Sequence, residues 1–157
     1  MGIKAKTPPA VVALLVLAAC SSSQPSGPQA KVPQPQFAIA QVFGPFEAGF
    51  PYGPMEVQYR FEIANRADEV LTLKRITIST VNPEGGAYSL VAPHDYYFNK
   101  QFAPKSSDAL EFWARAYAYG RSMRDSEPVT IRGVMYFQAA SGGYVNQIFV
   151  RELMQQQ

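Results

Sequence analysis

From Met55 to Ala64, apolar and polar side chains alternate at every position as far as Ile63 (MEVQYRFEIA). Successive side chains of a β-strand point to opposite faces, whereas the apolar positions of a helix recur every three or four residues. The segment is therefore predicted to be a half-buried strand of an antiparallel sheet, with Val57, Tyr59 and Phe61 on its apolar face.

Further segments of this kind follow at short intervals. Between Val70 and Thr80 the apolar phase slips by one residue at Lys74-Arg75, and we expect a β-bulge there because a bulge restores the inward face. Ser141-Gly142-Gly143 is predicted to turn the last two strands into a hairpin. The other expected strands are 37–43, 87–91, 96–102, 129–138 and 144–153. About seven or eight short strands predict an all-β fold, an antiparallel β-sandwich.

Residues 109–120 fit two structures. As a strand, the segment places Leu110, Phe112 and three alanines on one side, and the larger polar and aromatic residues on the other. As a helix, it would be capped by Asp108 with Glu111 three residues later. We favour the strand because the alternation persists throughout and the surrounding segments are β, although the alanines favour the helix.

The first 19 residues have the organisation of a secretory signal peptide. Lys4 and Lys6 form the positive region, and an unbroken apolar run follows from Ala10 to Ala19. A membrane-spanning helix needs about 20 apolar residues, so this run is too short for a stable transmembrane anchor.

Leu17-Ala18-Ala19-Cys20, at the end of this run, resembles the lipobox of bacterial lipoproteins. The resemblance implies cleavage before Cys20, a diacylglyceryl thioether on its sulfur and acylation of its new amino group. It places the protein in the cell envelope, and Ser21 after the cysteine implies the periplasmic side of the outer membrane if the host is Gram-negative. The alternative is an ordinary signal peptide with a chance cysteine.

Residues 20–36 are predicted to be a lipidated cysteine and a disordered tether. Ser, Gln and Gly surround four prolines there, and almost nothing apolar is available for burial. An extended tether of this kind could hold the domain up to about 50 Å from the bilayer. The β-sandwich is expected over residues 37–154, with a short tail at 155–157.

Charge and cysteine content exclude several functions. Without Lys4 and Lys6, 12 basic and 12 acidic residues remain, so no overall field attracts nucleic acid. One cysteine and one histidine cannot form an intramolecular disulfide or a Cys/His metal cluster. No cofactor and no metal are expected.

Three segments resemble small immunoglobulin and fibronectin III-like sandwiches, among which bacterial lipoproteins of the LEA14 type are nearest in outline. They are 61–65 (FEIAN), 102–104 (FAP) and 130–133 (TIRG) leading to Phe137. The Asn-Pro-Asn often found after the early strand of that family is replaced by Asn65-Arg66-Ala67. The resemblance implies an immunoglobulin-like fold and carries no function.

Aromatic residues supply the candidate ligand surface. On a strand, Trp113, Arg115, Tyr117 and Tyr119 share one face, a row suited to stacking on a sugar or gripping a protein. The alternative is that this face is the buried one, which the usual burial of large aromatics favours.

Catalysis is not expected. His94, the only histidine, lies in a turn-like Ala-Pro-His-Asp stretch, and a solvated loop residue is the simpler interpretation. No Gly-x-Ser-x-Gly elbow accompanies it, so a hydrolase is the least favoured function. The sequence predicts a lipid-anchored, non-catalytic module that binds an envelope protein or takes part in assembly, with carbohydrate or peptidoglycan binding as the alternative.

Overall fold

A computed structural model describes residues 32–45, 52–81, 86–91, 94–119 and 128–153. Within these ranges the chain forms eight strands: β1 (Gln36–Phe43), β2 (Gly53–Ala64), β3 (Leu71–Thr80), β4 (Tyr88–Leu90), β5 (His94–Phe102), β6 (Ser107–Ala118), β7 (Val129–Ala139) and β8 (Tyr144–Leu153). No helix in the described part of the chain is long and apolar enough to cross a membrane.

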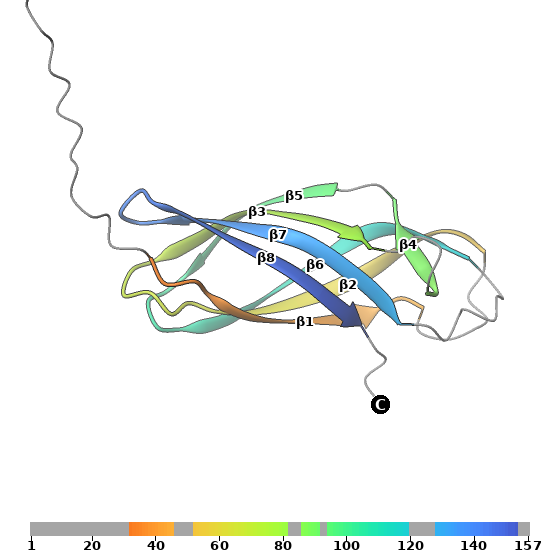
Figure 1. Cartoon of the computed structure of the whole chain (residues 1–157), viewed down its shortest axis with the longest axis horizontal. Helices are drawn as coiled ribbons and strands as arrows, with labels where there is room; N and C mark the ends of the chain where they lie inside the picture. Colours follow the sequence, from red (N-terminus) through yellow and green to blue (C-terminus); the bar gives the residue numbers. More distant parts are fainter. Residues whose placement is uncertain (1–31, 46–51, 82–85, 92–93, 120–127, 154–157) are drawn as a thin grey trace, which may run out of the picture. The chain divides into compact units, whose positions relative to one another are not determined.

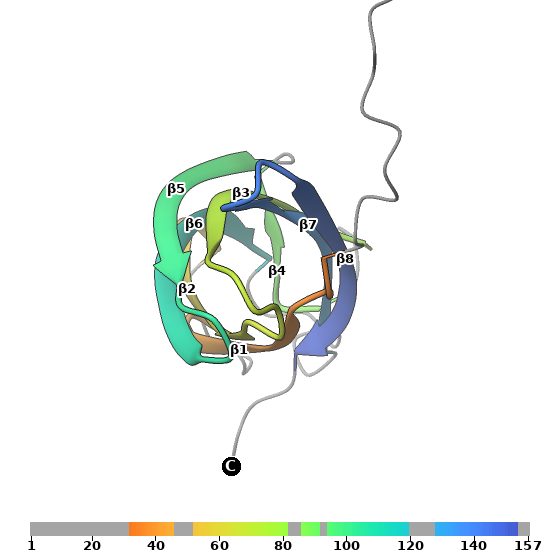
Figure 2. The ribbon, with the colours of Figure 1, turned by 90° about the vertical axis from the view of Figure 1, so that its left-hand side faces the viewer.

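The strands form two antiparallel sheets of four (Figure 1). The first sheet has the order β1-β2-β6-β4, and the second has the order β5-β3-β7-β8. In space this order resembles the A-B-E-D and C-F-G arrangement of immunoglobulin domains, with β5 added beside β3, but β4, in the position of strand D, precedes β5 in the chain. Seen along the strands, β5 of the second sheet lies beside β6 of the first (Figure 2). The predicted all-β, immunoglobulin-like sandwich is confirmed.

The alternating residues of β2 and β3 build the core. Val57, Tyr59 and Phe61 are fully buried, as predicted from the alternation. On β3 the pairing with β7 skips one residue between Leu73 and Arg75, which confirms the predicted bulge. Because of this bulge, the apolar residues on both sides of it point into the core (Leu71, Leu73, Ile76 and Ile78).

Residues 107–118 form a strand, β6, so the favoured interpretation is confirmed and the helix is wrong. Ala114, Ala116 and Ala118 are buried on its inner face, together with Phe112. The ring of Phe112 contacts rings of both sheets: Tyr59, Phe61, Tyr96 and Phe98, at centroid distances of 4.8 to 6.0 Å. The three alanines on the inner face of β6 leave room for these large side chains.

Other expected strands differ only at their ends. The predicted strand 87–91 is shorter, at Tyr88–Leu90, and the one expected from Tyr96 begins at His94. The hairpin of β7 and β8 forms around the predicted Ser141–Gly143 turn. Residues 1–31 and 154–157 lie outside the described residues, as do the signal peptide, the cysteine and most of the tether that we expect there.

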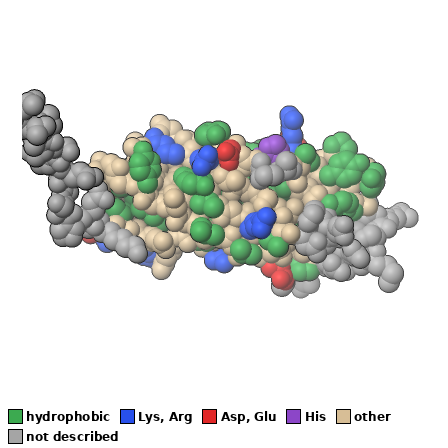
Figure 3. All heavy atoms as spheres, turned by 45° about the horizontal axis from the view of Figure 1, so that its top comes forward, with side chains coloured by type: hydrophobic (Ala, Val, Ile, Leu, Met, Phe, Trp, Pro, Cys, Tyr) green, Lys and Arg blue, Asp and Glu red, His purple; other side chains and the backbone are tan. Residues whose placement is uncertain are grey.

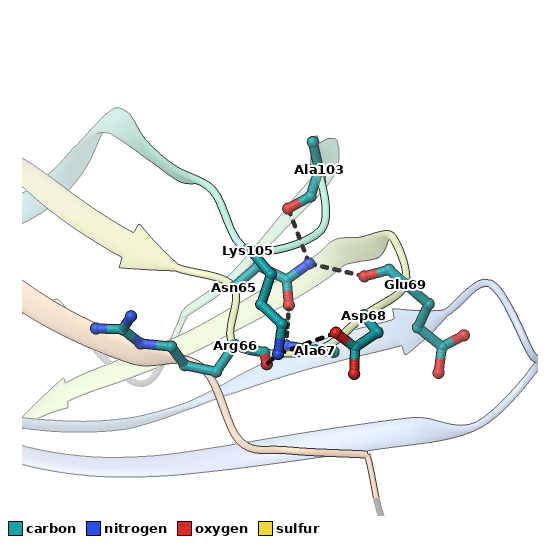
Figure 4. Close-up of polar contacts among 7 residues, drawn as sticks. All are labelled: Asn65, Arg66, Ala67, Asp68, Glu69, Ala103 and Lys105. Atoms are coloured by element: carbon teal, nitrogen blue, oxygen red, sulfur yellow. Dashed lines mark hydrogen bonds and ion pairs between the residues drawn. The ribbon is translucent and has the colours of Figure 1, made fainter.

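Asn65, directly after β2, forms hydrogen bonds with the β2–β3 loop and the β5–β6 loop (Figure 4). Its side chain is 1% exposed. The Nδ2 donates to the carbonyl oxygens of Glu69 at 2.8 Å, Phe102 at 3.1 Å and Ala103 at 3.0 Å, and the Oδ1 accepts from the Ala67 N–H at 2.9 Å. One amide thereby satisfies buried backbone groups of two separate loops.

Candidate functional site

The outer face of β6 carries the predicted ligand residues. Trp113 is 47% exposed and Arg115 is also exposed, while Ala114 between them and Ala116 after them are buried. The interpretation that placed this aromatic face in the interior is therefore wrong. The inner face of β6 instead packs against Tyr59 and Phe61, which leaves too little volume for an indole.

Trp113 is held in place by a second aromatic ring. The ring of Phe43, at the end of β1, lies 5.4 Å from the indole, measured between centroids. Both side chains are about half exposed, at 52% for Phe43 and 47% for Trp113. Such a contact restricts the rotamers of Trp113 while leaving part of its indole open to solvent.

The side chains of Tyr117 and Tyr119 interact with other residues of the domain. Tyr117 packs edge-on against Tyr52 at 5.2 Å, and the contact raises the pKa of the Tyr117 phenol, mainly through a hydrogen bond to Tyr52. Tyr119 donates from its hydroxyl to Ser89 at 2.6 Å. The predicted row of four residues therefore divides into two exposed residues and two tyrosines that are partly buried.

A cleft of about 270 Å³ opens beside the exposed pair. It is lined by Trp113 and Arg115 of β6, Glu56 of β2, and three consecutive residues of β5, 94–96. Glu56 and Arg115 are direct partners in the pairing of β2 with β6. The cleft lies where the two sheets meet, since β5 belongs to the second sheet and β2 and β6 to the first.

Some polar side chains of the cleft have hydrogen-bond or ion-pair partners within the described part of the domain, and others do not. Asp95 is engaged, because its carboxylate accepts from Thr77 at 2.6 Å and pairs with Arg75 at 3.2 Å. The Nε2 of His94 is buried, and no hydrogen-bond partner for it occurs among the described residues. Arg115 has no ion pair with any described acidic residue.

Tyr96 forms the floor of this region. Its ring packs on Phe112 at 4.8 Å, and burial raises the pKa of its phenol. His94 lies edge-on to Tyr96 at 6.1 Å. His94 is thus half-buried against the core and is not the solvated loop residue that we expected.

A second hollow, of about 260 Å³, lies on the outer face of β7 and β8, where no motif in the sequence indicated a site. Ile148 and Val150 are 72% and 54% exposed beside it. At this sheet edge, the carbonyls of the same two residues accept hydrogen bonds from Gln147 and Arg151. These side chains cover part of the edge of β8.

Other elements of the prediction fall outside this region. The lipobox residues Leu17, Ala18, Ala19 and Cys20 lie outside the described residues. Within the described ranges, no group of three or more His, Cys, Asp or Glu side chains could hold a metal ion. Glu56, His94 and Tyr96 were missed as binding-site residues. The pairing of β2 with β6 brings Glu56 beside Arg115, and the packing of β5 against β6 brings His94 and Tyr96 to the same cleft.

No protein-family model matches the chain, and no curated protein matches it. A solved target of the Northeast Structural Genomics Consortium aligns with a TM-score of 0.50 at 10% identity, over 78% of this chain and 86% of its own. A Bordetella pertussis protein provisionally named ApaA scores 0.49 at 10% identity, over 79% and 96%. An Archaeoglobus fulgidus protein scores 0.44 at 13% identity, over 74% and 91%. At such identity the first likeness concerns the fold alone.

Proposed function

We propose that the protein is a lipid-anchored lipoprotein of the cell envelope whose β-sandwich acts as a non-catalytic protein-binding or assembly module. The observation that carries the proposal is the lipobox-like Leu17-Ala18-Ala19-Cys20 directly after an apolar run. The lipid fixes the chain to one membrane, on the periplasmic side of the outer membrane in a Gram-negative host. The proline-rich tether then holds the domain away from the surface.

The lipid chemistry accounts for the anchoring. A single acyl chain gives only marginal membrane binding, at about 0.8 kcal/mol for each buried CH₂ group. Several chains on one cysteine make release very slow. The lipid would thereby keep the β-sandwich at the bilayer.

Substitution of the cysteine tests the anchor. We expect the wild-type protein to incorporate a radioactive fatty acid and to enter the detergent phase of a phase separation. Cys20→Ala should remain unlabelled and stay in the aqueous phase or unprocessed, and Ser21→Ala should behave as the wild type. Label retained on Cys20→Ala, or a mature wild-type chain that begins elsewhere, would contradict the proposal.

Exposed side chains on β8 support a protein partner. Ile148 and Val150 flank the second hollow, which is lined mostly by apolar surface. Apolar side chains grouped beside a hollow are a common feature of protein-binding surfaces. In-cell crosslinking of the anchored form should yield defined adducts that Ile148→Asp removes and Asn146→Asp retains. Identical adducts in both variants would argue against this face.

Carbohydrate or peptidoglycan binding is the second candidate. It is favoured by the outward orientation of Trp113, because an exposed, supported indole can stack on a sugar ring. Trp113→Ala should abolish retention of the protein on insoluble cell-wall material, whereas Tyr97→Ala, at another exposed aromatic residue, should not. Equal retention of both variants would remove this candidate.

A further inference from the structure

We propose that the cleft between β2, β5 and β6 binds a sugar unit that bears a carboxylate, the acidic unit of a glycan. The inference rests on the carbohydrate-binding function proposed above. It changes the residues predicted to bind the sugar, which were Trp113, Arg115, Tyr117 and Tyr119. Trp113 and Arg115 remain, while Glu56 and His94 take the place of the two engaged tyrosines.

The indole provides the stacking surface. Trp113 borders the cleft on one side and is braced by Phe43 on the other, so its orientation is set before a ligand arrives. Binding groups that are already ordered lose little conformational entropy when the ligand docks. The cleft volume, about 270 Å³, lies below the roughly 300–1,000 Å³ of sites for drug-sized molecules, and favours a single ring.

Arg115 selects the acidic group. It lies two residues beyond Trp113 on the same face of β6 and has no acidic ion-pair partner among the residues that the structure describes. A guanidinium can donate two parallel hydrogen bonds to a carboxylate, which fixes the orientation of the ligand as well as its charge. A neutral sugar would leave this group unused.

Glu56 and His94 can form hydrogen bonds with the hydroxyl and amide groups of a sugar. Glu56 is the cross-strand partner of Arg115 and lines the same cleft, where its carboxylate can accept hydrogen bonds from ring hydroxyls. The buried Nε2 of His94 lacks a partner in the described structure, and a ligand hydroxyl or amide would satisfy it. The nearby Glu56 and Asp95 carboxylates disfavour a multiply charged anion such as phosphate.

Fluorescence provides a direct test, because Trp113 is the only tryptophan of the chain. The full processed protein, in detergent micelles, is titrated with two matched pairs of sugars. N-acetylmuramic acid differs from N-acetylglucosamine by a lactyl group with a carboxylate, and glucuronic acid differs from glucose in its carboxylate. We expect Trp113 emission to respond to each acidic sugar at a concentration at least about tenfold lower than to its neutral partner, because even one charged hydrogen bond from Arg115 contributes about that much.

Two arginine variants then locate the selectivity. Arg115→Gln should bind the acidic and neutral sugars alike, whereas Arg132→Gln, at an exposed arginine of the second sheet, should keep the preference. Equal responses of the wild type to acidic and neutral sugars, no response to any of them, or an unchanged preference in Arg115→Gln would overturn the proposal. A negative result in the sugar titrations does not bear on the proposed lipid anchor, because the anchor is tested separately by fatty-acid labelling. A protein that is retained on cell-wall material through Trp113 but binds acidic and neutral sugars alike would overturn only the specificity for acidic sugars and would leave carbohydrate binding in place.

Discussion

The phenolic oxygens of Tyr59 and Tyr88 lie 2.8 Å apart inside the sandwich, where both side chains are fully buried. Tyr88 donates its hydrogen to the Oε1 of Gln41 at 2.7 Å, so Tyr59 must be the donor in the contact between the two hydroxyls. This chain links β2, β4 and β1 of the first sheet. It secures the short strand β4 through a side chain as well as through its three backbone pairs.

Tyr88→Phe should destabilise the domain by about 1–3 kcal/mol. The substitution keeps the ring but leaves the Gln41 Oε1 without a donor and the Tyr59 hydroxyl without its acceptor. Urea unfolding monitored by circular dichroism measures the loss. Tyr144→Phe, on the exposed face of β8, is the control and should change stability by less than about 0.5 kcal/mol. Equal stability of the two variants would show that the chain of hydroxyls contributes nothing.

The same tyrosines should make the domain sensitive to alkali. Burial is the main cause that raises the pKa of Tyr59 and of Tyr88 above the ordinary value of 10.0. Above about pH 10 the unfolded chain loses these protons while the folded chain retains them, so the free energy of unfolding falls as the pH rises. Unfolding at pH 8 and at pH 11 should show this decline. The double variant Tyr59→Phe/Tyr88→Phe should show a smaller decline, and an identical one would refute the assignment to this pair.

Asn65→Asp should be among the most damaging substitutions, at about 3 kcal/mol or more near neutral pH. It places a buried carboxylate among three carbonyl oxygens that now receive hydrogen bonds from Nδ2. Burial raises the pKa of such a carboxyl, and its protonated form can donate one bond, so part of the stability should return as the pH falls. Asn99→Asp, exposed beside Lys74, should be nearly neutral. Comparable losses in both variants would contradict the role of Asn65.

Gly133→Ala should cost about 1–3 kcal/mol. A Cβ at Gly133 would lie 2.1 Å from the Thr77 carbonyl oxygen and 2.6 Å from the Phe149 ring, so both the backbone and the ring must move. At Gly143, in the β7–β8 turn, the nearest atoms would be 3.9 Å away, and Gly143→Ala should be tolerated. Thermal unfolding of the two variants checks the difference. A Gly133→Ala protein with wild-type stability would show that the packing between β3, β7 and β8 is loose.

Asp108 should titrate below its ordinary pKa of 3.8. Its hydrogen bond and ion pair with Lys100 is the main cause, and the Ala109 N–H adds to it. A carboxyl with a lowered pKa stabilises the folded state at higher pH and loses that contribution as the pH falls through its folded pKa. Carboxyl NMR should show the titration midpoint moving upward in Lys100→Gln. An unmoved midpoint would show that the lysine does not interact with it in solution.

Local periodicity was sufficient to predict most strands. The alternation in β2 and the phase slip between Leu73 and Ile76 depend only on which residues are adjacent, so both the strand and its bulge could be predicted from the sequence. Strand ends were less accurate. The start of β5 at His94 and the shortness of β4 depend on pairing with β3 and β6, which neighbouring residues do not encode.

The candidate site shows the same division. The alternation in β6 correctly grouped Trp113 with Arg115, but both faces of that strand carry aromatic residues, so the period could not tell which one is buried. Pairing with β2 decided it, because Trp113 lies opposite Gln58 while Phe112 lies opposite Tyr59. Residues directly opposite each other share a face, and the inner face of β2 is unambiguous.

Sequence alone thus established the β-rich domain, its main core residues and the lipobox-like segment, since each depends on residues close together in the chain. The tertiary structure decided that Trp113 faces solvent and that His94 lies beside it. His94 and Trp113 belong to different sheets, and only the packing of one sheet against the other brings their strands together. Contacts of that kind depend on register and on the volumes of buried side chains, which are properties of the whole folded domain.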